Sequence, residues 1–197
     1  MPIRVANVNE SEGFDTLMRY LVIMLTTVFL ATVAAVGVSA VDSPVAEAAG
    51  GGYVKKCGGG EIKLNAREKE TFLLHNKIRN NRNLKPFCVH PKLQQAARSH
   101  SKDMIQRGYF SHNTKGRGSF KQRLKRFGYR GYAGENIAHS SGRSGDPSSI
   151  MEGWMNSSGH RSNILSGNYR EIGIGAHTGD YNNFRTTMYT VDFGTCL

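Results

Sequence analysis

The sequence has 197 residues and a formal net charge of +11. If an N-terminal targeting segment is removed, the remaining residues are enough for one domain. A domain of that size can bury about two-thirds of its unfolded surface, so neither a metal nor a disulfide is required for a stable core. From residue 50 onward, 24 Lys and Arg oppose 10 Asp and Glu, a net charge of +14. This excess of positive charge favours anionic partners such as wall polymers, lipid headgroups or acidic proteins, and solubility is the alternative explanation.

The N-terminal part carries an uncharged run of nineteen residues, 20–38, preceded by Arg19. Small residues follow it, and cleavage near Ala40 or Ala48 is typical of a secretory signal peptide. We therefore expect residues 1–49 to direct export of a secreted, extracellular protein. The alternative is an N-terminal membrane anchor, since residues 20–38 are long enough to span a bilayer. Because residues 1–17 are mildly acidic, Met18 would make a better start than Met1.

Export argues against nucleic acid as a partner, and no basic stretch is interleaved with aromatic residues in a nucleic-acid-binding motif. Three cysteines lie in the exported part: Cys57, Cys88 and Cys196. Thiols outside the cytosol tend to oxidise, and three cannot all pair within one chain. We favour a Cys57–Cys88 disulfide, which leaves Cys196 free in a monomer. A dimer through Cys196 is the alternative. The cysteine spacing matches no common zinc site.

The helices are expected first along the chain. Residues 50–64 are rich in glycine and predict a flexible lead-in, and the domain proper is expected over 65–197. Asn65 and Glu68 form a capping-box pattern. Apolar spacing, caps and first-turn prolines predict helices at 66–81, 91–107 and 119–126, and another that opens at Asp146-Pro147.

The C-terminal third changes its periodicity. Residues 171–177 and 186–193 alternate at period two and predict two strands, joined by a hairpin loop at 178–183. Helices first and a β-ribbon last indicate an α+β fold and not an alternating parallel sheet.

The sequence lacks a nucleophile elbow, a zinc-protease helix and a phosphate-binding loop. Three stretches of unusual composition remain, each with a titratable side chain among apolar or turn residues: Gly108–Asn113, Gly134–Ala138 and Trp154–Leu165. In this order, and with Leu74–Arg79 before them and Val191–Gly194 after them, they resemble the bacterial branch of the CAP superfamily. This superfamily includes cysteine-rich secretory proteins, antigen 5 and plant pathogenesis-related 1 proteins, and the likeness covers about residues 68–195.

The resemblance implies a three-layer α-β-α sandwich with a central cleft. It also implies that His112, Glu135 and His160 meet in that cleft. Many eukaryotic members carry a second cleft glutamate at the position that Ser157 occupies here. Without it, a mechanism that uses two carboxyl groups with separated pKa values loses one member, so we do not carry that mechanism over.

Two imidazoles and a carboxylate are a reasonable ligand set for Zn²⁺ or another divalent metal. We therefore predict a metal-competent cleft in a binding module for a lipid, a wall polymer or another extracellular ligand. The alternative activity is a metal-assisted hydrolase, for which Glu135 would be the catalytic residue. A purely structural polar cluster of His112, Glu135 and His160 is the third interpretation.

Other conspicuous residues are predicted to have structural roles. His75, His100 and Trp154 are expected in the core, and His139 and His177 at the surface. Arg161 either binds an anion at the cleft or caps a turn. The basic stretch 121–126 is expected to be a solvated helix face, with contact to an anionic polymer as the alternative.

Overall fold

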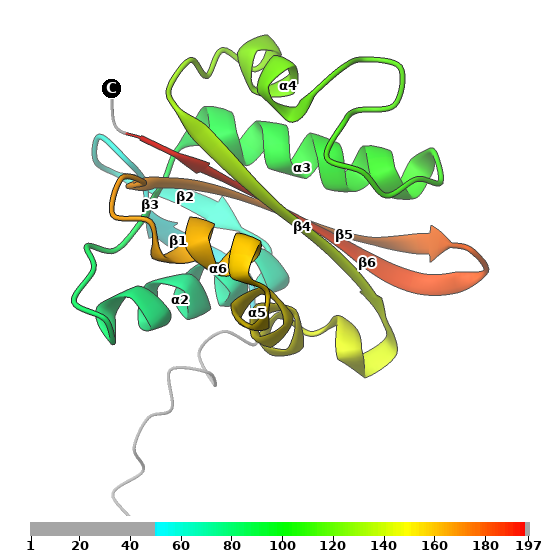
Figure 1. The fold of residues 1–197 in the computed structure, drawn as a ribbon. Helices are drawn as coiled ribbons and strands as arrows, with labels where there is room; N and C mark the ends of the chain where they lie inside the picture. The colour runs from blue at the N-terminus through cyan, green and yellow to red at the C-terminus, as the bar shows by residue number, and fades with distance from the viewer. Residues whose placement is uncertain (1–49, 196–197) are drawn as a thin grey trace, which may run out of the picture. The chain divides into compact units, whose positions relative to one another are not determined.

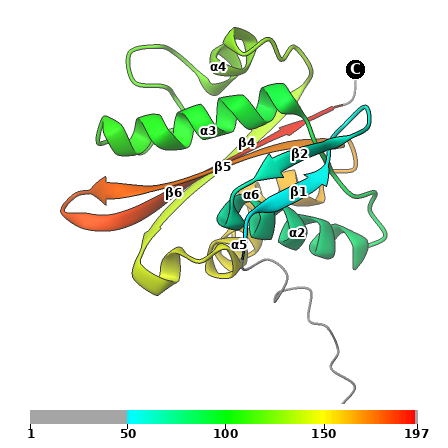
Figure 2. The same cartoon turned by 180° about the vertical axis from the view of Figure 1, so that it is seen from behind.

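The computed structural model describes residues 50–195 (Figure 1). The expected targeting segment and Cys196 lie outside these residues. Within them, no helix is both long and apolar enough to span a bilayer. Helices lie on both sides of a mixed four-stranded sheet, as the two opposite views show (Figures 1 and 2). The predicted α+β sandwich is therefore confirmed.

The sheet has the strand order β3-β5-β6-β4, so β4 forms one edge. Strands β5 (Glu171–Tyr181) and β6 (Phe184–Gly194) make the predicted hairpin, but both are longer than expected. The turn between them shrinks to Asn182 and Asn183, which both have positive φ angles, 49° and 66°. Asparagine tolerates this left-handed conformation better than most residues, so the two strands can pair up to the turn.

Two strands of the sheet were not predicted. Strand β4 (Ala133–Ser141) pairs antiparallel with β6, and the short β3 (Cys88–Val89) pairs parallel with β5. In β4 the alternation of polar and apolar residues is broken, because Glu135 and Asn136 point to opposite faces of the sheet and are both buried. The pattern on which strand prediction depends is therefore missing.

One face of the sheet is covered by α2 (Ala66–Asn80), α5 (Pro147–Asn156) and α6 (Ser158–Leu165). They enclose the main apolar core, which includes Phe72, Trp154, Ile174, Val191 and Phe193. Asn65 and Glu68 form the capping box expected before α2. At α5, in contrast, Asp146 makes no capping bond, and its carboxylate accepts a hydrogen bond from Arg67 of α2 at 3.4 Å.

The opposite face is covered by α3 (Pro91–Gln106), on which α4 (Phe120–Arg126) packs. Gly173 and Gly175 of β5 lie directly beneath α3. A Cβ atom at either position would overlap the main chain of Leu93–Gln94 or Ala97–Arg98. Glycine is required here because helix and strand backbones approach too closely for any side chain.

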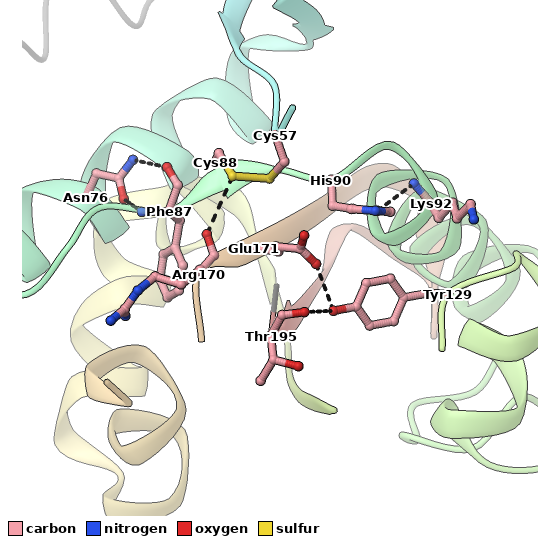
Figure 3. Close-up of a disulfide and its surroundings, with 10 residues drawn as sticks. All are labelled: Cys57, Asn76, Phe87, Cys88, His90, Lys92, Tyr129, Arg170, Glu171 and Thr195. Atoms are coloured by element: carbon pink, nitrogen blue, oxygen red, sulfur yellow. Dashed lines mark hydrogen bonds between the residues drawn. A yellow bond between two sulfur atoms is a disulfide. The ribbon is translucent and has the colours of Figure 1, made fainter. Parts of the chain in front are cut away.

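The segment 50–64 is not the flexible lead-in expected from its glycines. It forms an antiparallel hairpin of β1 (Gly52–Lys55) and β2 (Glu61–Leu64). Gly58, Gly59 and Gly60 supply the positive φ angles of the turn, so here glycine favours a tight turn over flexibility. The predicted Cys57–Cys88 disulfide is present and joins this hairpin to β3 (Figure 3).

Candidate functional site

Glu135 lies on β4 with its side chain on the face of the sheet that α3 covers. In the register it is opposite Asp192 of β6, so two carboxyl groups share one place on that face. Both side chains are fully buried. The side chain of Glu135 therefore points into the protein. Two buried carboxyl groups side by side require cationic or hydrogen-bonding partners.

The first partner of Glu135 is His112, in the loop between α3 and α4. Its Nδ1 lies 2.8 Å from Oε1 of Glu135, and its side chain is 50% exposed. An ionised carboxylate only accepts hydrogen bonds, so Nδ1 must carry the proton and Nε2 keeps its lone pair. Burial and the positive charge of Arg123 lower the pKa of His112. The ring is thus held neutral, with its basic nitrogen turned away from the carboxylate.

The second partner, Arg123 of α4, is a functional residue that the sequence interpretation missed. Its side chain is buried, and its Nη2 forms an ion pair with Oε2 of Glu135. Its Nη1 donates to the carbonyl oxygen of His112 at 3.1 Å and to the Thr114 hydroxyl at 3.2 Å. The basic stretch 121–126 was expected to be a solvated helix face. Its spacing contained the signal, because Arg123 falls on the stripe defined by Phe120, Leu124 and Phe127.

Asp192 completes the cluster from β6. Its Oδ1 lies 3.9 Å from Nη2 of Arg123, and neither carboxyl oxygen has a hydrogen-bond partner. Burial raises the pKa of Asp192 to about 7, against the opposing effects of Arg123 and His112. One guanidinium therefore serves two carboxyl groups, of which Glu135 holds the shorter contact. We call His112, Arg123, Glu135 and Asp192 the polar cluster.

His160 lies on α6, on the other side of the edge strand. Its carbonyl oxygen accepts a hydrogen bond from the Asn136 side chain at 3.0 Å, and that amide also accepts from Asn163. Burial lowers the pKa of His160, and protonation of His112 would lower it further. No hydrogen bond joins His160 to Glu135 among the described residues. The structure thus joins two of the three expected residues directly and leaves the third nearby.

The expected metal ligands are His112, Glu135 and His160. Between residues 50 and 195, no group of three or more His, Cys, Asp and Glu side chains is placed to hold a metal ion. Both oxygens of Glu135 already face a partner, His112 or Arg123. A closed set made of His112, Glu135 and His160 is therefore not confirmed. Only the two imidazoles match the nitrogen ligands that Zn²⁺ accepts.

The remaining residues singled out in the sequence occupy simpler positions. His75, His100 and Trp154 are buried, as predicted. Ser157 lies at the junction of α5 and α6, partly buried, and makes no side-chain capping bond. Arg161 donates to the Met155 carbonyl oxygen at 2.9 Å, which satisfies the end of α5.

His139 is exposed and packs edge-on against Phe110, with ring centroids 4.6 Å apart. His177 lies partly exposed on β5. The cluster itself therefore offers one nitrogen with a free lone pair at its surface, Nε2 of His112. Arg123, Glu135 and Asp192 hold that ring from behind.

Comparison with known proteins agrees with this arrangement. The model of the cysteine-rich secretory protein family, CAP, matches residues 72–193. An uncharacterized protein of Bacillus subtilis, YkwD, is 40% identical over 114 residues, which cover 57% of this chain and 43% of YkwD. A membrane protein of the same organism, YlbC, also uncharacterized, is 38% identical over 110 residues, or 55% of this chain and 31% of YlbC. The match thus spans less than half the length of either relative.

Solved structures support the same fold. An extracellular protein of Bacillus anthracis that contains an SCP domain has a TM-score of 0.55 and 34% identity, over 66% of this chain and 40% of that one. A cysteine-rich secretory protein of Staphylococcus aureus has a TM-score of 0.51 and 18% identity, over 66% and 38% of the two chains. At that identity the likeness concerns the fold alone. The family model covers most of the described residues, and we conclude that the chain belongs to the CAP, or cysteine-rich secretory protein, family.

Proposed function

We propose that this protein is an extracellular binding module whose ligand contacts the exposed edge of His112 and the neighbouring His160. The observation that carries the proposal is the half-exposed ring of His112, whose Nδ1 is fixed by a fully buried carboxylate. A binding residue that is held in one orientation loses little conformational freedom when a ligand arrives. Glu135 and Arg123 act as positioning residues in this proposal.

Export is supported by two observations. The Cys57–Cys88 disulfide is typical of proteins that fold outside the cytosol, and the Bacillus anthracis relative is described as extracellular. The net charge of +14 from residue 50 onward favours an anionic partner. We therefore propose a polymer or lipid of the cell envelope as the ligand class.

Co-sedimentation with purified Gram-positive cell walls tests the proposal. His112→Ala and His160→Ala should each reduce the fraction of protein bound, whereas His177→Ala should not, since that histidine lies on β5 away from the cluster. Both target residues are at least partly exposed, so the variants should keep the fold, and circular dichroism checks this. Equal binding by all three variants would contradict the assignment of the ligand to this face.

A divalent metal is the second candidate ligand. The carboxylate behind His112 fixes the tautomer that leaves Nε2 as a ligand, which is how carboxylates orient metal-binding histidines. His112 and His160 would hold the ion, which would supply a Lewis-acid contact to an anionic ligand. Titration calorimetry with Zn²⁺ should give heat that disappears in the His112→Ala/His160→Ala double variant. Absence of heat from the unmodified protein would remove the metal from the proposal.

Hydrolysis is less well supported than binding. The carboxylate that would have to act as a base, Glu135, is neutralised by the buried guanidinium of Arg123. A carboxylate in such an ion pair is a weaker base, because the nearby cation favours its charged form. We therefore propose binding as the main function of this face.

A further inference from the structure

A pocket of about 250 Å³ lies between α3, the turn at 114–118 and α4. Of the residues that line it, only Arg123 belongs to the polar cluster, and His112, Glu135 and His160 do not line it. The inference below therefore does not require a ligand at His112. Its volume is just below the range of about 300–1,000 Å³ that is usual for ligand pockets. It would accommodate a small ligand or one group of a larger one.

The walls of this pocket are strongly cationic. Three arginines line it, Arg117, Arg123 and Arg126. Asp103 is the one carboxylate among the described residues that line it, and it is already engaged by Arg107 at 3.5 Å and by the Tyr109 hydroxyl. Arg123 is already paired with Glu135, whereas Arg117 and Arg126 have no carboxylate partner among the described residues that line the pocket. An anion is the complementary ligand, and guanidinium groups match the oxygens of phosphate particularly well.

Local structure brings two of these arginines together. The main-chain N–H of Thr114 donates to the Gly118 carbonyl oxygen at 2.8 Å, which closes the turn that carries Arg117. Arg126 donates from Nη1 to the carbonyl oxygen of Arg117 at 2.7 Å. The end of α4 is thereby fastened to the turn, although like charges repel. An anion at this place would therefore meet two exposed guanidinium groups held close together.

Two buried nitrogen atoms of the lining residues have no hydrogen-bond partner. They are Nε of Arg123 and Nδ1 of His100, and both residues are at most 2% exposed. Nε of Arg123 is a donor that needs an acceptor. Burial lowers the pKa of His100 to about 4, and its Nε2 donates to the Ser111 carbonyl oxygen at 2.8 Å. Nδ1 of this neutral ring is therefore an acceptor that needs a donor.

A protonated phosphate group offers an acceptor for Nε of Arg123 and a donor for Nδ1 of His100 in one small ligand, and its charge complements the arginines. We propose that this pocket binds a phosphate group with a hydroxyl group on it or beside it, as in hydrogen phosphate or glycerol phosphate. Sulfate has the same shape and charge, but at neutral pH it has no proton to donate. Leaving the buried acceptor of His100 unsatisfied should weaken sulfate relative to phosphate.

Titration of the purified protein with hydrogen phosphate, followed by amide chemical shifts in NMR spectra, tests the proposal. Shifts of residues 114–127 should saturate with phosphate and be weaker with sulfate at equal ionic strength. The Arg117→Ala/Arg126→Ala double variant should bind at least about ten-fold more weakly, since it removes two charged hydrogen-bond donors from the pocket. Both residues are exposed, so the fold should survive their removal.

The matched control is Lys121→Ala/Lys125→Ala, which removes the same charge from exposed positions of the same helix that do not line this pocket. If the control weakens phosphate binding as much as the arginine variant does, the binding is a general charge effect and the proposal is wrong. The absence of saturable shifts would also overturn it. Titration with glycerol phosphate shows which kind of phosphate the pocket prefers. Tighter binding than that of hydrogen phosphate indicates a phosphate ester, and weaker binding indicates the free ion.

Discussion

The two faces of the central sheet differ in what they bury, although the same strands form both. Toward α2 and α5, β6 presents Tyr189, Val191 and Phe193, which pack into a continuous apolar core. Toward α3, the residues between them are Met188, Thr190 and Asp192, and the last of these joins the polar cluster. One strand therefore carries the main core on one side and a buried charge on the other.

The contacts on the two faces contribute to stability in different ways. Burial of apolar side chains stabilises the folded state by about 25 cal/mol per Å². A buried ion pair, in contrast, often contributes no more than well-packed apolar residues of the same volume would. The polar cluster therefore stabilises the fold no more than apolar side chains of the same volume would. The cluster has a function beyond stability if it holds His112 for a ligand, as proposed above.

The largest expected effect comes from breaking the charge balance of the cluster. Arg123→Met should lower the free energy of unfolding by about 3–5 kcal/mol, because Glu135 and Asp192 would remain buried without a cation. Urea denaturation at neutral pH measures this loss. Lys125→Met, an exposed substitution on the same helix, should cost less than about 0.5 kcal/mol. Adding Glu135→Gln and Asp192→Asn to Arg123→Met should recover part of the stability. A loss that stays the same would contradict the electrostatic explanation.

On the apolar face, Ile174→Ala should cost about 2–5 kcal/mol, since it opens a cavity in the main core. This loss should be the same at pH 5 and pH 8, because no ionisable group of the polar cluster lies on that face of the sheet. Denaturation at the two pH values, with Ile174→Val as the conservative comparison at about 0.5–1.5 kcal/mol, checks this. A strong pH dependence that persists when Asp192→Asn is added would arise from His75 in the same core, and one that disappears would show that the two faces are coupled.

The pH dependence of stability should reveal Asp192. Its folded pKa of about 7 lies above the ordinary value of 3.8, so the folded state binds more protons in this range and the contribution of Asp192 falls as pH rises from about 4 through 7. His75 and His100 have folded pKa values of about 4, below the ordinary 6.5, so their contribution rises with pH between these values. The two slopes oppose each other.

Asp192→Asn should remove only the falling contribution. Stability of the variant should therefore rise more steeply than that of the unmodified protein between about pH 4.5 and 6.5, from the linkage of proton binding to folding. Urea midpoints across this range give the comparison. Parallel profiles for the two proteins would mean that Asp192 titrates normally.

The smallest effect on stability is expected for His112→Ala, at less than about 1 kcal/mol, because the ring is half exposed and water can replace it beside Glu135. The same variant should lose wall binding if the exposed edge of the ring contacts the ligand. Thermal unfolding and co-sedimentation on the same preparation separate the two effects. A large loss of stability would instead assign His112 a structural role.

Much of the fold was predictable because caps and periodicity are local. The capping box at Asn65, the first-turn prolines at Pro91 and Pro147, and the period-two ribbon all lie where the sequence placed them. The hairpin at 50–64 was not predictable in the same way, because a run of glycines is compatible with both flexibility and a tight turn. The contacts of that hairpin with distant residues, including Cys88, decide between the two.

The polar cluster could be predicted only in part. The resemblance to a family placed His112 and Glu135 together, but the cation between the carboxyl groups was hidden in a helix that is charged on most sides. Only the position of Arg123 beside Leu124, on the apolar stripe, distinguishes it from exposed neighbours such as Lys125. Asp192 was equally hidden, because its burial follows from the register of β4 against β6.

The two glycines beneath α3 have a consequence for how the surface can evolve. Since Gly173 and Gly175 let the helix rest on the main chain of β5, the height of α3 above the sheet is independent of side-chain size. The loop from 107 to 119 starts at the end of that helix and carries both His112 and the turn at 114–118. Substitutions in this loop can therefore alter the surface around His112 while the packing of α3 on β5 stays unchanged.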